Sequence, residues 1–223
     1  MPPALWDYLP VIFSGITNTL VLTFAGIALG FVLGIPMAFA EVLGPRPLQV
    51  AIRRAGRVVR GIPLLVLLFM IFFGFPNLGI TLPPVPSAIL AIGIRSAAYQ
   101  AQLFRGAIEG VGYGQLEAAL SIGLTKWGAF RHVVLPQALR LAIPGWVNEF
   151  TIVLKDTSLA YAIGVTEVFT QAVHVAQVIL DYLTPLLVVA AIYFTITFTA
   201  SRLAETVYRR VSIPGLGGGA SYG

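Results

Sequence analysis

The chain has 223 residues, of which 57% are hydrophobic and only 10% are charged, and its formal net charge is +5. Soluble domains carry about 25% charged residues, so the composition excludes a soluble globular domain and predicts an integral membrane protein. Cysteine is absent, which excludes disulfides and thiolate metal sites. Because the basic residues flank apolar runs, the positive charge indicates membrane orientation and not nucleic-acid binding.

Apolar runs of membrane length recur along the chain, and each crossing of ~30 Å of hydrocarbon needs about 20 such residues. We predict an all-α integral membrane domain over residues 11–210, an extracytoplasmic segment over residues 1–10, and a disordered Gly-rich cytoplasmic tail over residues 211–223. The five predicted transmembrane helices cover residues 11–40, 61–78, 87–108, 136–154 and 182–207. A helical connection over residues 158–178 is expected to pack at the outer surface.

Glycines at every fourth position mark the first span, namely Gly26, Gly30 and Gly34. Small residues at this spacing allow close approach of a second helix, so we interpret them as a packing face and not as a ligand surface. If the basic segment after this span is cytoplasmic, 12 of the 14 Lys and Arg lie in or beside cytoplasmic segments. The positive-inside rule then places the N-terminus outside and the C-terminus in the cytoplasm.

The polar loop over residues 109–136 joins the third and fourth spans. Its residues 115–122 are expected to form a short helix that Gly123 ends in a left-handed conformation. Thr125 is expected to cap a second short helix. Pro136 is expected at the first helical position of the fourth span, where its missing N–H is no loss.

Seven residues of this loop fit the pattern EAA-xxx-G-x9-I-x-LP, with Val133 in the Ile position: Glu117, Ala118, Ala119, Gly123, Val133, Leu135 and Pro136. On this pattern the chain resembles the permeases of binding-protein-dependent ABC importers. Three further stretches are similar to the polar amino-acid subfamily, whose members carry histidine, glutamate or glutamine, arginine and opines. They are RGIPLLVLLF at residues 60–69, AAYQAQLFRGAIE at residues 97–109 and NEFTIVLKDTSLAYAIGVTEV at residues 148–168.

The resemblance covers roughly residues 15–210 and implies a type I ABC importer permease with a cytoplasmic EAA coupling loop. It implies that the loop docks in a groove of the ATP-binding cassette subunit through Glu117, Ala118, Ala119, Gly123, Leu135 and Pro136. It also implies two copies of that ATPase, and that these copies bind ATP and Mg. The other implied partners are a second identical or homologous permease and an extracytoplasmic amino-acid-binding protein, at a prokaryotic cytoplasmic membrane. The alternative is an ordinary amphipathic cytoplasmic loop.

Two adjacent pairs of charged or polar residues, seven residues apart, lie in and directly after the fourth span. Seven residues turn a helix by about 700°, so Glu149 and Asp156 share one face, and Asn148 and Lys155 share the neighbouring face. Each charge costs about 2.5–3.5 kcal/mol in the bilayer, so these residues are expected to face a bundle interior or a wet cavity.

The resemblance implies that Glu149 and Asp156 line a substrate pocket, which Asn148, Lys155 and Ser158 are expected to complete. The alternative is a local Lys155–Asp156 pair that holds a kink. Two more residues of the third span stand out, a charge within the span and a departure from the family pattern. Arg95 is expected to pair with Glu41 or Glu149, and Gln102 replaces the usual Glu.

The favoured function is the import of a polar L-amino acid by alternating access in a permease dimer, with a basic side chain weakly favoured. No G-xxxx-G-K-[ST] phosphate loop occurs, so ATP hydrolysis is assigned to the partner chain and no cofactor to this one. An ion-coupled secondary carrier or a channel is the alternative. A membrane enzyme is disfavoured because H-E-x-x-H and G-x-S-x-G are absent, and His132 and His174 lie too far apart to suggest a metal site.

Overall fold

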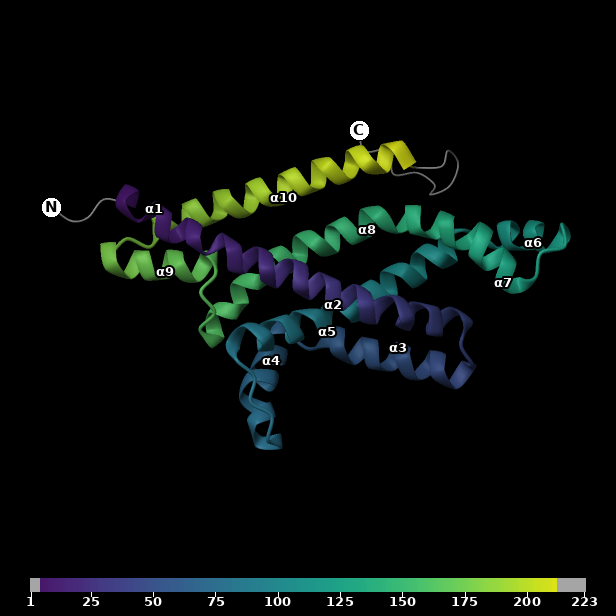
Figure 1. Ribbon diagram of the computed structural model, residues 1–223, viewed down its shortest axis with the longest axis horizontal. Helices are drawn as coiled ribbons and strands as arrows, with labels where there is room; N and C mark the ends of the chain where they lie inside the picture. The colour runs from purple at the N-terminus through teal and green to yellow at the C-terminus, as the bar shows by residue number, and fades with distance from the viewer. Residues whose placement is uncertain (1–4, 212–223) are drawn as a thin grey trace.

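The computed structural model describes residues 5–211, and every regular element in that range is a helix. In chain order these are α1 (Leu5–Ser14), α2 (Ile16–Leu43), α3 (Arg46–Gly61), α4 (Leu64–Phe69), η1 (Met70–Gly74), η2 (Phe75–Leu78), α5 (Pro84–Gly110), α6 (Tyr113–Ser121), α7 (Lys126–Ala129), η3 (Phe130–Val134), α8 (Leu135–Asp156), η4 (Thr157–Ile163), α9 (Val168–Ile179) and α10 (Leu183–Val211). The long helices α2, α5, α8 and α10 run roughly along the long axis, and α6 and α7 lie together at one end (Figure 1). The all-α expectation is confirmed.

The helix boundaries differ from the expected ones at both ends of the chain. Helix begins at Leu5, so residues 5–10 are helical and continue almost directly into the first span. At the other end α10 still includes Val211, where the tail was expected to begin. The expectation of a disordered tail otherwise falls on residues 212–223, outside the described part of the chain.

Two helical stretches, Leu5–Leu43 and Leu183–Val211, are each long and apolar enough to cross a membrane. Two further pairs qualify only when joined across a bend: Arg46–Gly61 with Leu64–Leu78, bent by 98°, and Lys126–Ile163 with Val168–Ile179, bent by 53°. Helix α5 has 27 residues and so extends about 40 Å, but its polar side chains lower its hydropathy. The count of five spans stays a prediction.

The second predicted span is broken where it was expected to begin. Ile62 precedes Pro63, whose ring disfavours helical backbone in the residue before it, and Ile62 has an extended ψ of 125°. Apolar helix therefore starts only at Leu64 and continues through a π-helical turn and a 3-10 turn to Leu78. Figure 1 shows this short arm projecting sideways from the bundle.

The small-residue stripe of α2 packs against α5. A Cβ added at Gly26 would lie 2.5 Å from the Ile92 side chain, and one at Gly30 would lie 2.6 Å from Gln100 Nε2. At Gly34 the nearest atom would be the Ala97 carbonyl oxygen, 2.9 Å away. These three positions admit no side chain without a shift, which confirms that the stripe is a helix-packing face.

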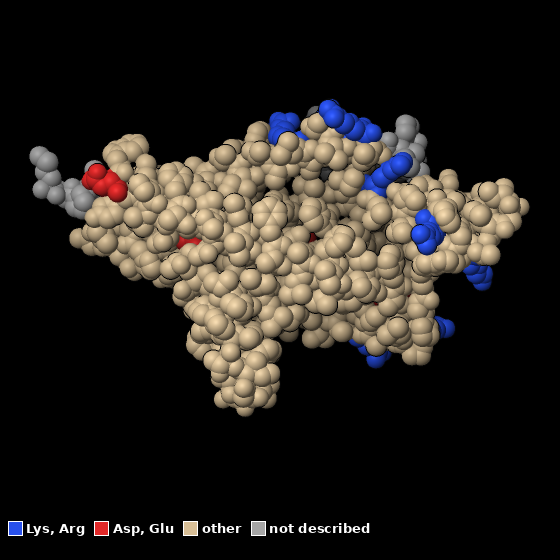
Figure 2. Space-filling view, in the orientation of Figure 1, with Lys and Arg blue, Asp and Glu red and all other residues tan. Residues whose placement is uncertain are grey.

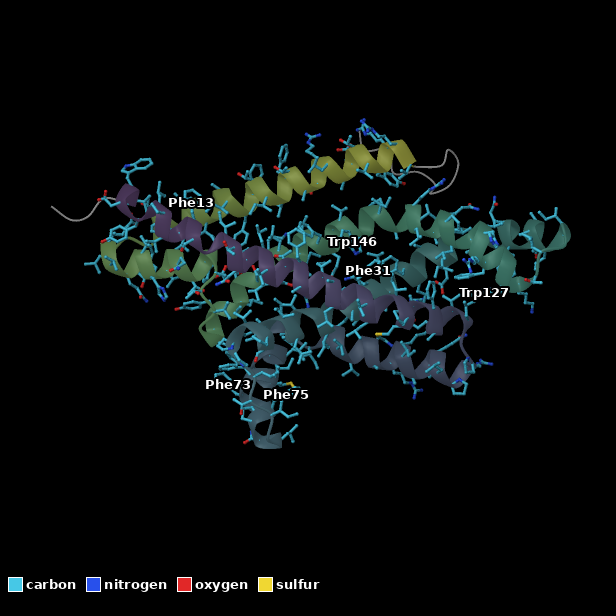
Figure 3. All side chains as sticks on the ribbon, viewed as in Figure 1. Phe13, Phe31, Phe73, Phe75, Trp127 and Trp146 are labelled. Atoms are coloured by element: carbon cyan, nitrogen blue, oxygen red, sulfur yellow. The ribbon has the colours of Figure 1, made fainter. Side chains whose placement is uncertain are left out.

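The outer surface of the bundle is largely apolar, and its basic charge lies toward one end. Large side chains on it, such as Phe13, Phe31 and Phe73, are exposed (labelled in Figure 3). Lys and Arg side chains gather toward the end that carries α6, α7 and the C-terminal part of α10 (Figure 2). An apolar flank with a basic end is the surface expected of a membrane-embedded protein.

Gly15, between α1 and α2, offers a stability test of this packing. An added Cβ would lie 2.6 Å from backbone atoms of Glu167 and Val168, which cannot rotate away. We expect Gly15→Ala to lower the free energy of unfolding by about 1–3 kcal/mol, the usual cost of overpacking. Thermal unfolding in nanodiscs measures the effect.

Gly106→Ala is the control, because this glycine lies inside α5 and has nothing within 4 Å of the added Cβ. Its melting temperature should be unchanged or slightly higher, since alanine favours helix over glycine by about 1 kcal/mol. Equal melting temperatures for both variants would contradict the close contact at Gly15.

Candidate functional site

The loop between α5 and α8 is built as two short helices joined at Gly123. Gly123 has φ +89°, the left-handed conformation, and its N–H donates to the Leu120 carbonyl at 3.0 Å. The Leu124 N–H donates to the Ala119 carbonyl at 3.2 Å. Thr125 caps α7 by accepting from the Gly128 N–H at 3.1 Å. Both sequence expectations for the loop are confirmed.

The residues expected to contact a partner divide into exposed and buried ones. Glu117, Ala118 and Gly123 are exposed on α6 and its end. Ala119 is buried, and its small side chain permits close packing inside the loop. The docking role expected of the two alanines stays a prediction.

Leu135 and Pro136 lie beyond the loop, in a helix that runs without interruption from Lys126 to Ile163. Pro136 lies in the first turn of α8, close to the first helical position expected for it. The chain before it is already helical, however, so α8 continues an existing helix. A π-helical turn over Phe130–Val134 precedes it, and the helix passes directly from the loop into the bundle. A force on the loop can thus reach α8 through continuous helix.

The sequence analysis missed three large side chains on the loop. Tyr113, Ile122 and Trp127 are 79%, 79% and 60% exposed, and Trp127 lies at the α7 end of the molecule (Figure 3). Apolar residues in an otherwise polar loop were a signal for them, although others, such as Val111 and Phe130, are buried in a small core. Exposed apolar side chains on a short, defined helix pair are typical of a protein interface.

At the centre of the bundle a chain of hydrogen bonds joins α2, α5 and α8. Glu149, which is 4% exposed, accepts from Ser96 Oγ at 2.8 Å. Gln100 Nε2 donates to Ser96 Oγ and to the Ile27 carbonyl, both at 3.1 Å. Trp146 Nε1 donates to Gln100 Oε1 at 3.1 Å. The sequence analysis missed Gln100 and gave weight to Gln102, which is exposed.

Asp156, two turns beyond Glu149, forms an ion pair with Arg95. The expectation that Arg95 pairs with Glu41 or Glu149 is therefore wrong. Arg95 and Ser96 are neighbours on α5, and each contacts one of the two acidic residues on the same face of α8. Glu41 is instead paired outside this site.

Glu41 Oε2 lies 3.0 Å from Arg105 Nε and 3.4 Å from Arg53 Nε. This cluster joins α2, α3 and α5 near the loop end of α5. Glu41 therefore does not pair with Arg95, which pairs with Asp156.

The remaining predicted site residues lie outside this inner face. Asn148 and Lys155 are exposed, and Ser158 Oγ donates to the Lys155 carbonyl at 2.7 Å. Within residues 5–211, Lys155 forms no ion pair with Asp156, so the alternative of a local pair that holds a kink is not supported. The structure brings Glu149 and Asp156 together against α5 and leaves Asn148 and Lys155 directed outward.

Glu167 is a further buried carboxylate, and it was not among the predicted site residues. It caps α9 by accepting from the Thr170 N–H at 2.6 Å and the Phe169 N–H at 2.9 Å. It also accepts from Tyr193 OH at 2.9 Å, which ties α9 to α10. With every contact directed to the protein, Glu167 is a structural clamp at the end opposite the loop.

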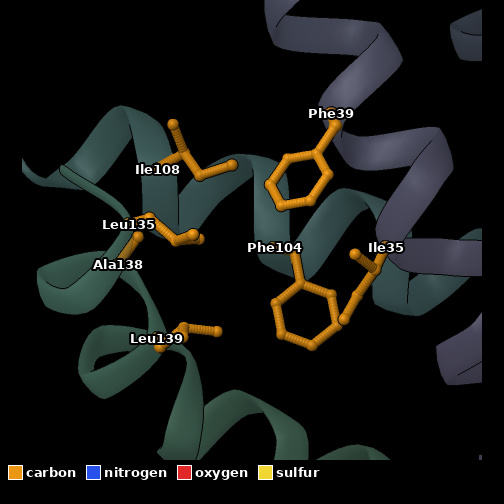
Figure 4. A pocket seen from close by; sticks show the side chains of 7 residues that line it. All are labelled: Ile35, Phe39, Phe104, Ile108, Leu135, Ala138 and Leu139. Carbon is orange, nitrogen blue, oxygen red and sulfur yellow. The ribbon is translucent and has the colours of Figure 1, made fainter. Parts of the chain in front are cut away.

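A small pocket lies between α2, α5 and α8, and apolar side chains line it (Figure 4): Ile35, Phe39, Phe104, Ile108, Leu135, Ala138 and Leu139. It offers a polar solute no hydrogen-bond partner. In the part of the chain that the structure describes, no three His, Asp or Glu residues lie close enough to bind a metal ion.

An apolar helical bundle with a compact two-helix loop at one end and charged pairs between its helices defines the transmembrane subunit of a transporter. The family model described as "Binding-protein-dependent transport system inner membrane component" matches residues 26–213, and this chain belongs to that family. It is similar to the L-cystine transport system permease protein TcyB of Bacillus subtilis, with 37% identity over 92% of this chain and 91% of that one. It is 33% identical to the glutamine transport system permease protein GlnP of Escherichia coli over 94% of this chain and 97% of that one.

Solved structures agree. One chain of a crystal structure of an amino acid ABC transporter with histidines superimposes with a TM-score of 0.87 and 35% identity, over 92% of this chain and 96% of that one. A chain of the inward-facing MetNI methionine ABC transporter shares the fold, with a TM-score of 0.80 and 20% identity over 93% of this chain and 99% of that one.

The chain is thus the permease subunit of a binding-protein-dependent ABC importer, embedded in the inner membrane, and it is not an enzyme. ATP is hydrolysed on a separate ATPase chain, and the assembly contains a second permease. The ion-coupled carrier and the channel are not supported.

Proposed function

We propose that this permease imports a polar L-amino acid by alternating access, in a dimer of permeases on two ATPase subunits that bind ATP and Mg. An extracytoplasmic binding protein delivers the amino acid. The names of the relatives support this cargo class, since they carry L-cystine and glutamine. The observation that carries the proposal is the set of charged side chains inside an apolar bundle. Each such charge is costly in a membrane, so its presence there indicates a functional site.

The proposed substrate site centres on Glu149 and Asp156 of α8. Asn148, Lys155 and Ser158 extend it toward the exposed side of the helix. An α-amino acid brings one ammonium and one carboxylate, and this group of residues offers partners for both. Because α8 continues into the coupling loop, movement of the loop would tilt the helix that carries the site.

The proposed orientation places the loop and the C-terminus in the cytoplasm and the N-terminus outside. The basic end of the molecule supports it, because cytoplasmic loops of membrane proteins carry an excess of Lys and Arg (Figure 2). The exposed side chains of Tyr113, Ile122 and Trp127 would then face the ATPase subunit.

The test is a reconstitution of the permease with its ATPase and binding protein in vesicles, screened across the twenty L-amino acids and L-cystine. We expect one or a few polar amino acids to stimulate ATP hydrolysis and to accumulate inside. Accumulation of a solute of another class, or stimulation by none of the amino acids, would overturn the proposal.

A further inference from the structure

The Arg95–Asp156 ion pair is a preformed pair of opposite charges in the proposed substrate site. The side chains of Arg95 and Asp156 are 19% and 23% exposed, so the pair is neither sealed in the core nor free in solvent. The Arg95 guanidinium also lies 4.9 Å from the centre of the Tyr99 ring, which holds its position on α5. Helices α5 and α8 each contribute one charge to this pair.

We propose that the pair stands in for the cargo's own charges, and that an amino acid binds by exchange with it. The cargo carboxylate replaces Asp156 on Arg95, and the cargo ammonium replaces Arg95 on Asp156. The inference rests on the proposed function and adds two statements to it. Recognition is directed at the zwitterion, and the cargo side chain is neutral.

Pairing of charges is the reason that a zwitterion is required. Exchange breaks one ion pair and forms two, so no charge is left without a partner. A ligand with only an ammonium would pair with Asp156 and strand Arg95, and a ligand with only a carboxylate would do the reverse. Leaving one member of a partly buried pair uncompensated is strongly unfavourable, so both ligands should bind poorly.

The neighbouring charges explain the neutral side chain. Glu149 is only 4% exposed, so its carboxylate is withdrawn from direct contact with a cargo cation, and Asp156 is taken by the cargo ammonium. Neither acidic group then offers a contact to a second cation. The exposed Lys155 adds a further positive charge beside Asp156. A basic side chain would thus find no accessible carboxylate to pair with, whereas a neutral amide or thioether needs none.

The test measures ligand binding to the permease–ATPase complex in nanodiscs without the binding protein. The tightest-binding amino acid of the twenty and L-cystine is compared with the two analogues that keep its side chain and lack one charge. For glutamine these analogues are 4-aminobutanamide and glutaramic acid. We expect the wild-type complex to prefer the zwitterion over either analogue by at least about tenfold, on the scale of one charge-assisted contact.

The variants R95Q and D156N should each abolish the preference over one of the two analogues. R95Q should weaken binding of the amino acid and abolish its advantage over the amine. D156N should abolish its advantage over the carboxylic acid. The reversed pair R95D/D156R keeps an ion pair for folding, so we expect the wild-type melting temperature. It exchanges the positions of the two charges that the cargo meets, so binding should be weak. R202Q, which removes an exposed ion pair with Glu205 on α10, is the control and should change neither preference.

The outcomes separate the two proposals. If no amino acid binds to or is carried by the wild type, the proposed function fails and the exchange fails with it. If an amino acid binds but R95Q and D156N reduce all three ligands equally, or R95D/D156R restores full binding, the pair is structural and only the exchange is wrong. Tightest binding of arginine or lysine would contradict the neutral side chain.

Discussion

Replacing Gly123 with valine will leave ATP hydrolysis running while amino-acid uptake falls by about tenfold or more. Gly123 has φ +89°, a conformation that costs an L-residue with a side chain about 1–2 kcal/mol. The space around it is open, with nothing within 4 Å of an added Cβ, so the effect arises from the backbone and not from a clash. The bend between α6 and α7 should open, and the exposed side chains of Ile122 and Trp127 should lose their relative position.

Uptake per ATP hydrolysed, measured in vesicles, is the quantity that decides this prediction. Gly114→Val is the matched control, because Gly114 is also exposed in the loop with open space around it but lies inside α6 without a positive φ. Its uptake should stay near the wild-type value. If the double variant of Glu117→Gln and Gly123→Val transports normally, the loop has no coupling role.

Glu149→Gln is expected to reduce uptake by about ten- to a hundredfold without loss of stability. Glutamine has nearly the same shape and can still accept the hydrogen bond of 2.8 Å from Ser96, so the network through Gln100 and Trp146 can persist. Removing a charge from the bundle interior relieves a cost of about 2.5–3.5 kcal/mol. What the variant loses is a buried negative charge on the same face of α8 as Asp156, which attracts the cargo ammonium without contacting it. A ten- to hundredfold loss corresponds to about 1.4–2.8 kcal/mol.

The measurement combines uptake with thermal unfolding. Asn148→Ala, a neighbouring and exposed position on α8, controls for general disturbance of the helix and should have a smaller effect on uptake. A fall in melting temperature in proportion to the loss of uptake would indicate that Glu149 is only a structural residue. Normal uptake with normal specificity would remove Glu149 from the substrate site.

Local rules were sufficient where a short stretch decides the structure. The bend at Gly123 and the cap at Thr125 depend on backbone conformation and on one side-chain contact within four residues, and both are found as expected. The stripe of Gly26, Gly30 and Gly34 follows from helical spacing, which the sequence states directly.

Pairings between distant residues could not be predicted in the same way. The expected partners of Arg95 were Glu41 and Glu149. Its pairing with Asp156 instead depends on the relative rotation of α5 and α8, which no spacing within either helix encodes. Gln100 was overlooked for the same reason, because its partners Ile27 and Trp146 come from two other helices. The break at Ile62 was predictable from Pro63, but the apolar run around it concealed the boundary.

The central claim is that this chain moves solute only when a separate ATPase drives it through the loop. Uptake should therefore be compared in vesicles that contain the permease alone, with imposed proton and sodium gradients, and in vesicles that also contain the ATPase, the binding protein and internal ATP and Mg. We predict accumulation only in the second preparation, and its disappearance when ATP is replaced by a non-hydrolysable analogue. Full-rate accumulation by the permease alone, under any gradient, would contradict the account.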